Sequence, residues 1–275
     1  TEPLILWDYL YRLVVPHAHT AGLFNDDYPV VTHLFQQPSA WAALLGLILL
    51  AGLALWARRR WPWLALAVLF FLAGHLLEST TVMLELYFEH RNYLPSLFLL
   101  LPAAVLLVRL ARTETRPAIL LAVAVLTVPA FATASRALLW GEPNRLIMVW
   151  AAERPDSPRA QRSAALALSR QGRDDLALIQ LRRTMERLPQ HAESRLHYLL
   201  VTCRTGRLTP DQFAAQLTAL REGRYQFQSF GLLQATVSML SQAGCLPDGH
   251  AKAIAVLDAI LAQPSTQGRP KRGLI

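Results

Sequence analysis

Four long apolar stretches dominate the first half of the chain. They contain no Asp, Glu, Lys or Arg, and each has 17 to 19 residues: Ser39 to Ala57, Trp61 to Leu77, Asn92 to Val108 and Pro117 to Ser135. An α-helix needs roughly 17 to 25 such residues to cross a ~30 Å hydrocarbon core. The pattern therefore predicts a transmembrane domain of about four helices over residues 39–136, with kinks at Pro102 and Pro129.

Basic residues between these stretches predict the orientation of the domain. The turn between the first two stretches is Arg58–Arg60, and three more Arg lie at 109–116, between the third and the fourth. Short loops rich in Arg stay in the cytoplasm. We therefore expect residues 1–38 to be an outer loop, with residues 78–91 and everything after about 136 also outside.

From about Trp140 onward the pattern changes to amphipathic helices that end at Gly or Pro. Apolar residues spaced three and four apart, with Gly172 at the turn and Pro189 at the end, predict a helix-turn-helix of about 34 residues. Thr209 and Pro210 open a later helix as its N-cap and first residue.

The chain is thus expected to be all-α, with a polytopic helical membrane domain followed by a tetratricopeptide-like α-solenoid. We assign the solenoid to residues 140–263 and a disordered basic tail to residues 264–275.

The composition supports a division of the chain into a half that faces lipid and a half that faces water. The chain is 53% hydrophobic and only 17% charged, which excludes disorder and argues against an ordinary soluble globule. Nearly all of its net charge of +8 belongs to the second half, where Arg residues are scattered without interleaved aromatic residues. Nucleic-acid binding is therefore not expected, and the lipid bilayer is the first expected partner.

The loop after the second apolar stretch holds the densest group of ionisable residues near a membrane, where charge is costly unless it is paired or used. In it, Arg91 can donate two hydrogen bonds to phosphate oxygens, His90 can donate a proton to a leaving phosphate, and Glu89 can orient His90. The alternative is a structural ion pair of Glu89 or Glu85 with Arg91. The candidate residues of this loop are His75, Glu78, Glu89, His90, Arg91, Asn92 and Tyr93.

A second group lies in the first outer segment. His17 and His19 precede Asp26, Asp27 and Tyr28. These His and Asp residues are the candidates for a divalent metal, but they lack the fixed spacing of a metal motif, and no cofactor is required by the sequence. A turn nucleated by Asn25, Asp26 and Asp27 is the alternative reading.

The two cysteines, Cys203 and Cys245, both lie in the polar half. If that half is outside the cytoplasm, they lie in an oxidising space and can form a disulfide. The alternative is that both are small buried residues of the repeat helices.

The sequence from Glu89 to Ser96, Glu-His-Arg-Asn-Tyr-Leu-Pro-Ser, together with the segment from Pro16 to Tyr28, resembles the later membrane helices of the transmembrane and tetratricopeptide-repeat-containing family. That family is similar to GT-C glycosyltransferases, which take a sugar from a polyprenyl-phosphate carrier on the outer membrane face. In such enzymes the catalytic acid lies in the first outer loop, after the first span. The resemblance therefore implies that this chain is the C-terminal portion of such a protein, with the acid upstream.

Two functions follow. The first is a GT-C-like glycosyltransferase portion in which Arg91 and His90 contact the carrier phosphate, Glu89 positions them, and Asp27 with Tyr28 shapes the pocket. The second is a noncatalytic membrane anchor whose repeat helices bind a partner protein or acceptor.

Overall fold

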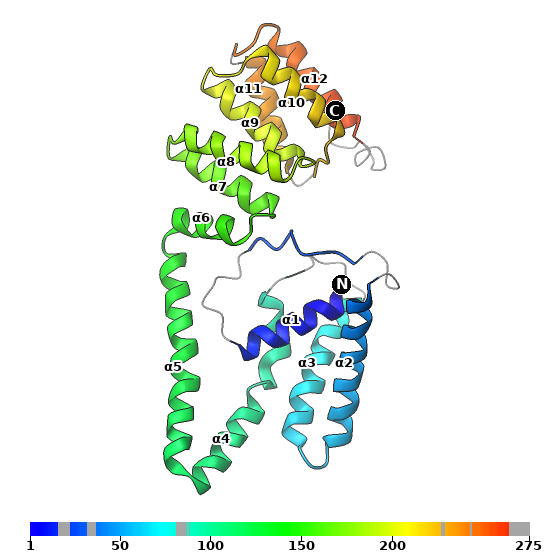
Figure 1. Ribbon diagram of the computed structural model, residues 1–275, viewed down its shortest axis with the longest axis vertical. Helices are drawn as coiled ribbons and strands as arrows, with labels where there is room; N and C mark the ends of the chain where they lie inside the picture. Colours follow the sequence, from blue (N-terminus) through cyan, green and yellow to red (C-terminus); the bar gives the residue numbers. More distant parts are fainter. Residues whose placement is uncertain are drawn as a thin grey trace. The chain divides into compact units, whose positions relative to one another are not determined.

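A computed structural model describes residues 1–15, 23–31, 37–80, 87, 89–226, 229–242 and 244–263. Over those ranges the chain is helical without a sheet, apart from one isolated bridge between His191 and Arg224. The chain divides into two compact units, Thr1–Glu142 and Pro143–Ile275 (Figure 1). The expected disordered tail at 264–275 lies outside the described residues.

The first unit is built on a helical hairpin, α2 (Pro38–Ala57) and α3 (Pro62–Thr80), joined at Arg58–Arg60. α2 carries no charged residue, and it buries small Ala side chains against its neighbours while large ones such as Leu49 and Leu53 stay exposed. This is the reverse of a soluble helix, because small residues let two membrane helices approach closely while large ones meet lipid.

The third apolar stretch does not form one continuous α-helix. It begins at the end of η2 (Glu89–Asn92), continues through η3 (Pro95–Phe98) and enters α4 (Leu101–Thr113), which precedes α5 (Thr115–Trp140). Pro102 lies in the first turn of α4, where its missing N–H costs nothing, so the expected kink there is wrong. Pro129 lies inside α5, which is helical on both sides of it.

Within the part of the chain that the structure describes, three helical segments are long and apolar enough to cross a membrane: Pro38–Ala57, Pro95–Thr113 and Thr115–Trp140. The second expected span, Trp61 to Leu77, falls largely within α3, whose described part includes a shorter apolar helix at Pro62–Leu76, so the fourth span stays a prediction.

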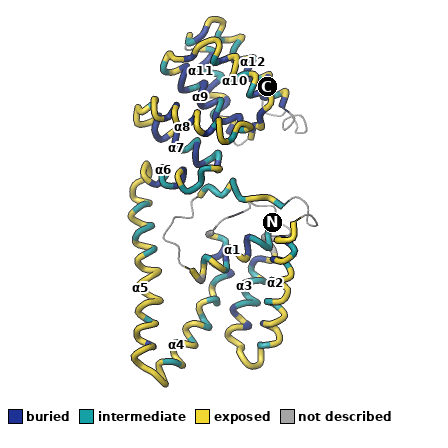
Figure 2. The backbone as a smooth tube through the Cα atoms, viewed as in Figure 1, coloured by how far each residue is buried: buried dark blue, intermediate teal, exposed yellow. Residues whose placement is uncertain are grey.

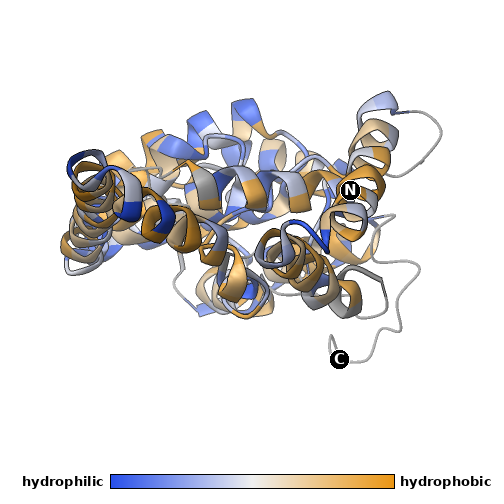
Figure 3. Ribbon diagram, turned by 90° about the horizontal axis from the view of Figure 1, so that it is seen from below, coloured by the Kyte–Doolittle hydropathy of each residue, from blue (hydrophilic) through white to orange (hydrophobic). Residues whose placement is uncertain are grey.

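α5 leaves most of its apolar side chains exposed, as its yellow tube in Figure 2 shows, and the apolar side chains of α4 are exposed or half-buried, with none fully buried. Apolar residues, orange in Figure 3, dominate the helices of this unit. Leu120, Leu126 and Phe131 are each more than 70% exposed. Burying one such side chain is worth about 1.5–3 kcal/mol, so a surface of this kind is suited to lipid and not to water.

The segment expected to be an outer loop begins with a helix, α1 (Glu2–Val14). The first part of the segment 1–38 is therefore helical, and its placement outside the membrane stays a prediction. α1 lies against the end of the hairpin opposite Arg58–Arg60 (Figure 1), and it buries Ile5, Leu6 and Tyr9 against Leu47 and Phe71.

The second unit contains seven helices within its described residues. They are α6 (Pro143–Glu153), α7 (Pro158–Arg170), α8 (Asp174–Arg187), α9 (Ala192–Arg204), α10 (Pro210–Glu222), α11 (Phe230–Gln242) and α12 (Gly249–Leu261). α9 packs against α7, α8, α10 and α11, and it contributes Leu196 and Leu199 to a core that includes Leu220, Leu233 and Val256. The predicted N-cap is confirmed, because Thr209 forms a capping box with Gln212.

The helix-turn-helix predicted around Gly172 is confirmed as α7 and α8, and its geometry recurs. Gly172 has φ +73° after α7, and Gly206 has φ +67° after α9, 34 positions later. The same hydrogen bond follows each glycine. The Arg173 N–H donates to the Leu168 carbonyl, and the Arg207 N–H donates to the Thr202 carbonyl. The α7–α8 pair is therefore followed by a second pair, α9–α10, of nearly the same length.

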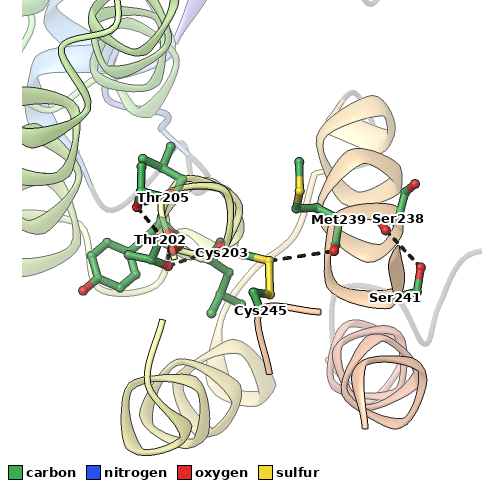
Figure 4. The surroundings of a disulfide bond; sticks show 10 residues. Thr202, Cys203, Thr205, Ser238, Met239, Ser241 and Cys245 are labelled. Carbon is green, nitrogen blue, oxygen red and sulfur yellow. Dashed lines mark hydrogen bonds between the residues drawn. A yellow bond between two sulfur atoms is a disulfide. The ribbon is translucent and has the colours of Figure 1, made fainter. Parts of the chain in front are cut away.

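Cys203 of α9 and Cys245, which precedes α12, form a disulfide with a Cα–Cα distance of 5.3 Å (Figure 4). The pairing links α9 to the connection between α11 and α12. Around it, Thr202 and Thr205 donate hydrogen bonds to carbonyls of their own helix.

Candidate functional site

The loop motif reaches the membrane hairpin through a close approach of Pro95 to Gly74. A Cβ on Gly74 would lie 2.9 Å from the Pro95 ring and 3.2 Å from its backbone, so only glycine allows this packing. Phe98 adds an edge-to-face contact with Phe70, with ring centroids 4.8 Å apart. These contacts hold η2 and η3 against the last turns of α3.

The same approach brings His75 to Asn92. His75 Nε2 lies 3.2 Å from Asn92 Oδ1, and the two side chains are only 2% and 8% exposed. Since the Asn92 oxygen accepts, the Nε2 of His75 carries the proton. A histidine so deeply enclosed is suited to hold the motif in place, not to exchange protons with a substrate.

Aromatic rings join three distant segments around this pair. Tyr9 of α1 stacks on His75 at 5.6 Å, and Tyr87 packs on Tyr9 at 4.8 Å. Tyr28 then stacks on Tyr87 at 5.6 Å, and Phe71 meets His75 edge-on at 4.7 Å. We call these residues, with Asn92, the aromatic cluster.

Charged groups of α1 border the aromatic cluster. Arg12 Nε donates to Asp8 Oδ2 at 2.9 Å, and the Arg12 guanidinium lies 5.5 Å from the centre of the Tyr87 ring. Burial raises the pKa of the Tyr87 phenol well above its usual range, and Asp8 raises it further. Burial raises the pKa of Tyr28 as well, so both phenols keep their protons at physiological pH.

The structure thus brings His75, Asn92 and Tyr28 together, three of the residues expected at a site. Arg91, which precedes Asn92 in η2, is half-buried, whereas His90 is exposed and Tyr93 is 82% exposed. The side chains of Glu78 and Glu89 lie outside the described residues, as does Glu85. The alternative ion pair with Arg91 is therefore untested.

The structure describes only part of the second predicted group, the His and Asp residues of the first outer segment. Asp26 is exposed and Asp27 half-buried, in a turn in which the Tyr28 N–H donates to the Asn25 carbonyl at 3.3 Å. The expected turn is therefore present. His17 and His19 lie outside the described residues, and within the described ones no three His, Cys, Asp or Glu residues are grouped to hold a metal.

Sequence reasoning missed Asp8, Tyr9, Arg12, Phe71 and Tyr87. A signal for the first three was available, because Asp8 and Arg12 are spaced as an i,i+4 ion pair in an amphipathic segment. Nothing in the sequence near Tyr87 indicated that its ring would contact α1, because the two segments are far apart in the chain.

The comparisons with known proteins add no relative: no protein-family model, no curated protein and no solved structure matches the chain.

Proposed function

We propose that this chain is the carrier-binding, C-terminal part of a GT-C-like membrane glycosyltransferase that uses a polyprenyl-phosphate-linked sugar. The observation that carries the proposal is the gathering of His75, Asn92 and Tyr28 from separate segments beside half-buried Arg91, at the end of the hairpin opposite Arg58–Arg60.

The surroundings of Arg91 suit an amphiphile with a phosphate head. A guanidinium stays charged at any physiological pH and can donate two parallel bonds to phosphate oxygens. Next along the chain, Leu94, Leu97 and Leu100 are 66%, 61% and 71% exposed. An isoprenoid tail can lie along these leucines while the phosphate meets Arg91, and the aromatic cluster holds the loop in that position.

The proposed location is a bacterial inner membrane with the second unit in the periplasm. Arg-rich turns at 58–60 and 109–116 favour the cytoplasm for the opposite end of the helices. The Cys203–Cys245 disulfide favours an oxidising compartment for the second unit. The 34-residue spacing of Gly172 and Gly206 is that of a tetratricopeptide repeat, and we assign the second unit to that kind of solenoid.

The test compares Arg91→Ala with Arg109→Ala, which removes an exposed Arg from α4. Polyprenyl-phosphate binding is measured by native mass spectrometry on both variants of this chain in nanodiscs. Sugar transfer is measured in membranes that hold the same two substitutions in the longer glycosyltransferase proposed here, because the catalytic acid is expected upstream of this chain. We expect Arg91→Ala to abolish transfer and to weaken carrier binding at least tenfold, while Arg109→Ala changes neither. Unchanged binding and transfer in Arg91→Ala would remove the assignment.

A further inference from the structure

The exposed side of α1 is apolar and aromatic. Leu4, Trp7 and Tyr11 follow one another at spacings of three and four, so they share one side of the helix. Trp7 is 37% and Tyr11 55% exposed, and Leu13 and Val15 at the C-terminal end are 40% and 39% exposed. A helix on the surface of a soluble domain normally presents charged or polar residues on its exposed side.

The charged residues in the middle of α1 form a pair. Arg12 Nε donates to Asp8 Oδ2 at 2.9 Å, and the two side chains are only 30% and 27% exposed. The other charged residue of the helix is Glu2, in its first turn. Charge is costly inside a membrane unless it is paired, and pairing of Asp8 with Arg12 lowers that cost for α1.

Contacts of Trp7 fix the level at which α1 meets α2. Trp7 Nε1 donates to the Ala43 carbonyl at 3.0 Å, and a Cβ on Gly46 would lie 3.0 Å from the Trp7 indole. Ala43 and Gly46 come five and eight positions after Pro38, the first residue of α2. At about 1.5 Å per residue, these contacts lie 8–12 Å along α2 from the end of the hairpin opposite Arg58–Arg60.

The contacts with α3 give the same level. Tyr9 stacks on His75 with ring centroids 5.6 Å apart, and His75 lies five positions before Thr80, the last residue of α3. This position is about 8 Å along α3 from the same end of the hairpin. The 20 residues of α2 match the ~30 Å thickness of a hydrocarbon core, so a helix at this level lies within one leaflet and not above the membrane.

The exposed surface of α2 at this level is also apolar. Leu45 and Leu49, on either side of Gly46 in the sequence, are 55% and 66% exposed. Large side chains of a membrane helix meet lipid, so lipid surrounds the hairpin at the depth where Trp7 contacts it. Trp and Tyr are enriched where headgroups meet acyl chains, since each ring has an apolar body and a polar tip. Lipid therefore fits the exposed side of α1 better than water does.

We propose that α1 is an interfacial helix, immersed in the membrane leaflet opposite Arg58–Arg60 with the side that bears Trp7 and Tyr11 against lipid. The helix runs across the hairpin and not along it, as Figure 1 shows, so it lies in the leaflet without spanning the membrane. This placement replaces the expected position of residues 2–14 outside the membrane. It involves neither Arg91 nor the carrier, and its test measures depth, so each proposal can fail alone.

The experiment places a nitroxide spin label on Tyr11→Cys in the full chain in nanodiscs. Native Cys203 and Cys245 are paired, so the label attaches to the introduced cysteine. EPR measures the collision rate of the label with oxygen, which concentrates among acyl chains, and with a water-soluble nickel chelate. Ile48→Cys, 58% exposed in the middle of α2, is the hydrocarbon reference, and Arg173→Cys, at an exposed turn of the second unit, is the water reference.

We expect the oxygen-to-nickel collision ratio at Tyr11→Cys to exceed that at Arg173→Cys by roughly fivefold or more and to stay below that at Ile48→Cys, because α1 lies between water and the middle of the membrane. Tyr11 is more than half exposed, so an unchanged thermal midpoint is expected. Leu13→Cys, a second exposed position of α1 with the same expected ratio, decides the matter if Tyr11→Cys does not fold.

A ratio at Tyr11→Cys equal to that at Arg173→Cys overturns the proposal, since α1 would then face water. Low collision rates with both reagents also overturn it, because the label would then be covered by protein, from another part of the chain or from a second copy. A ratio as high as that at Ile48→Cys would place α1 at the middle of the membrane and overturns it too.

Discussion

At the scale of single residues, the pKa of His197 in the second unit is strongly lowered. It lies on the buried side of α9, where burial and then Arg162 and Arg204 lower its pKa from 6.5 to about 4. Between these two values the unfolded chain binds a proton that the folded chain does not. Stability therefore rises with pH from about 4 to about 6.5, and it falls when the protein is acidified through that window.

We predict that His197→Asn removes much of this acid sensitivity, because the side chain no longer titrates. The contribution of His197 across the window is roughly 3 kcal/mol at most. Thermal midpoints of both proteins in detergent, measured from pH 4 to pH 7.5, provide the check. Parallel curves for the two proteins would show that other groups cause the acid sensitivity.

At the scale of elements, the packing of η3 on α3 depends on the missing side chain of Gly74. The nearest atoms to a new Cβ belong to the Pro95 ring and backbone, which cannot rotate away as a long side chain can. Gly52 of α2 is a natural comparison, since nothing lies within 4 Å of a Cβ built there.

We predict that Gly74→Ala destabilises the first unit by about 1–3 kcal/mol, the usual cost of overpacking. It should also weaken carrier binding, because the loop motif is displaced together with Asn92. Gly52→Ala should leave the thermal midpoint unchanged or raise it slightly, since alanine favours helix more than glycine does. A Gly74→Ala protein with the midpoint and carrier binding of the parent would show that η3 is not held in this way.

At the scale of the whole molecule, the proposed orientation and the disulfide make one joint prediction. Cys203 and Cys245 are paired, so neither reacts with maleimide unless the protein is reduced. A cysteine introduced by Arg59→Cys should not be labelled by a membrane-impermeant maleimide in spheroplasts, and it should be labelled after permeabilisation. One introduced by Arg173→Cys, at an exposed turn of the second unit, should react at once.

The reverse labelling pattern, or native Cys203 and Cys245 that react without reduction, would contradict the periplasmic placement of the second unit. Closing a loop over the 42 positions that separate the two cysteines stabilises a fold by about 4 kcal/mol in the chain-entropy treatment, so reduction should also lower the thermal midpoint.

The sequence alone predicted the elements whose signal is local. Apolar runs without charge marked the membrane helices, and the turn at Gly172 and the cap at Thr209 were readable because a helix end depends on a few adjacent residues. The helix at Glu2–Val14 was missed, although its pattern is amphipathic, because it lies in a segment that charge counting had assigned to a loop.

The candidate site was predicted only where its residues are neighbours in the chain. His75, Asn92 and Tyr28 were each singled out for their chemical type, but their meeting depends on Gly74, on Tyr87 and on α1. The depth of α1 along the hairpin could not be predicted from the sequence, because it depends on contacts of Trp7 with distant residues of α2.

What the sequence determined by itself is a helical protein with apolar helices in its first half and basic amphipathic helices in its second, since hydrophobic period, charge and the residues that end helices act over a few positions. Only the tertiary structure decided that α1 covers the hairpin, that Pro95 packs on Gly74, and that Trp7 contacts Ala43 and Gly46 of α2. These features join residues far apart in the chain, and burial and close approach exist only after such segments are packed together.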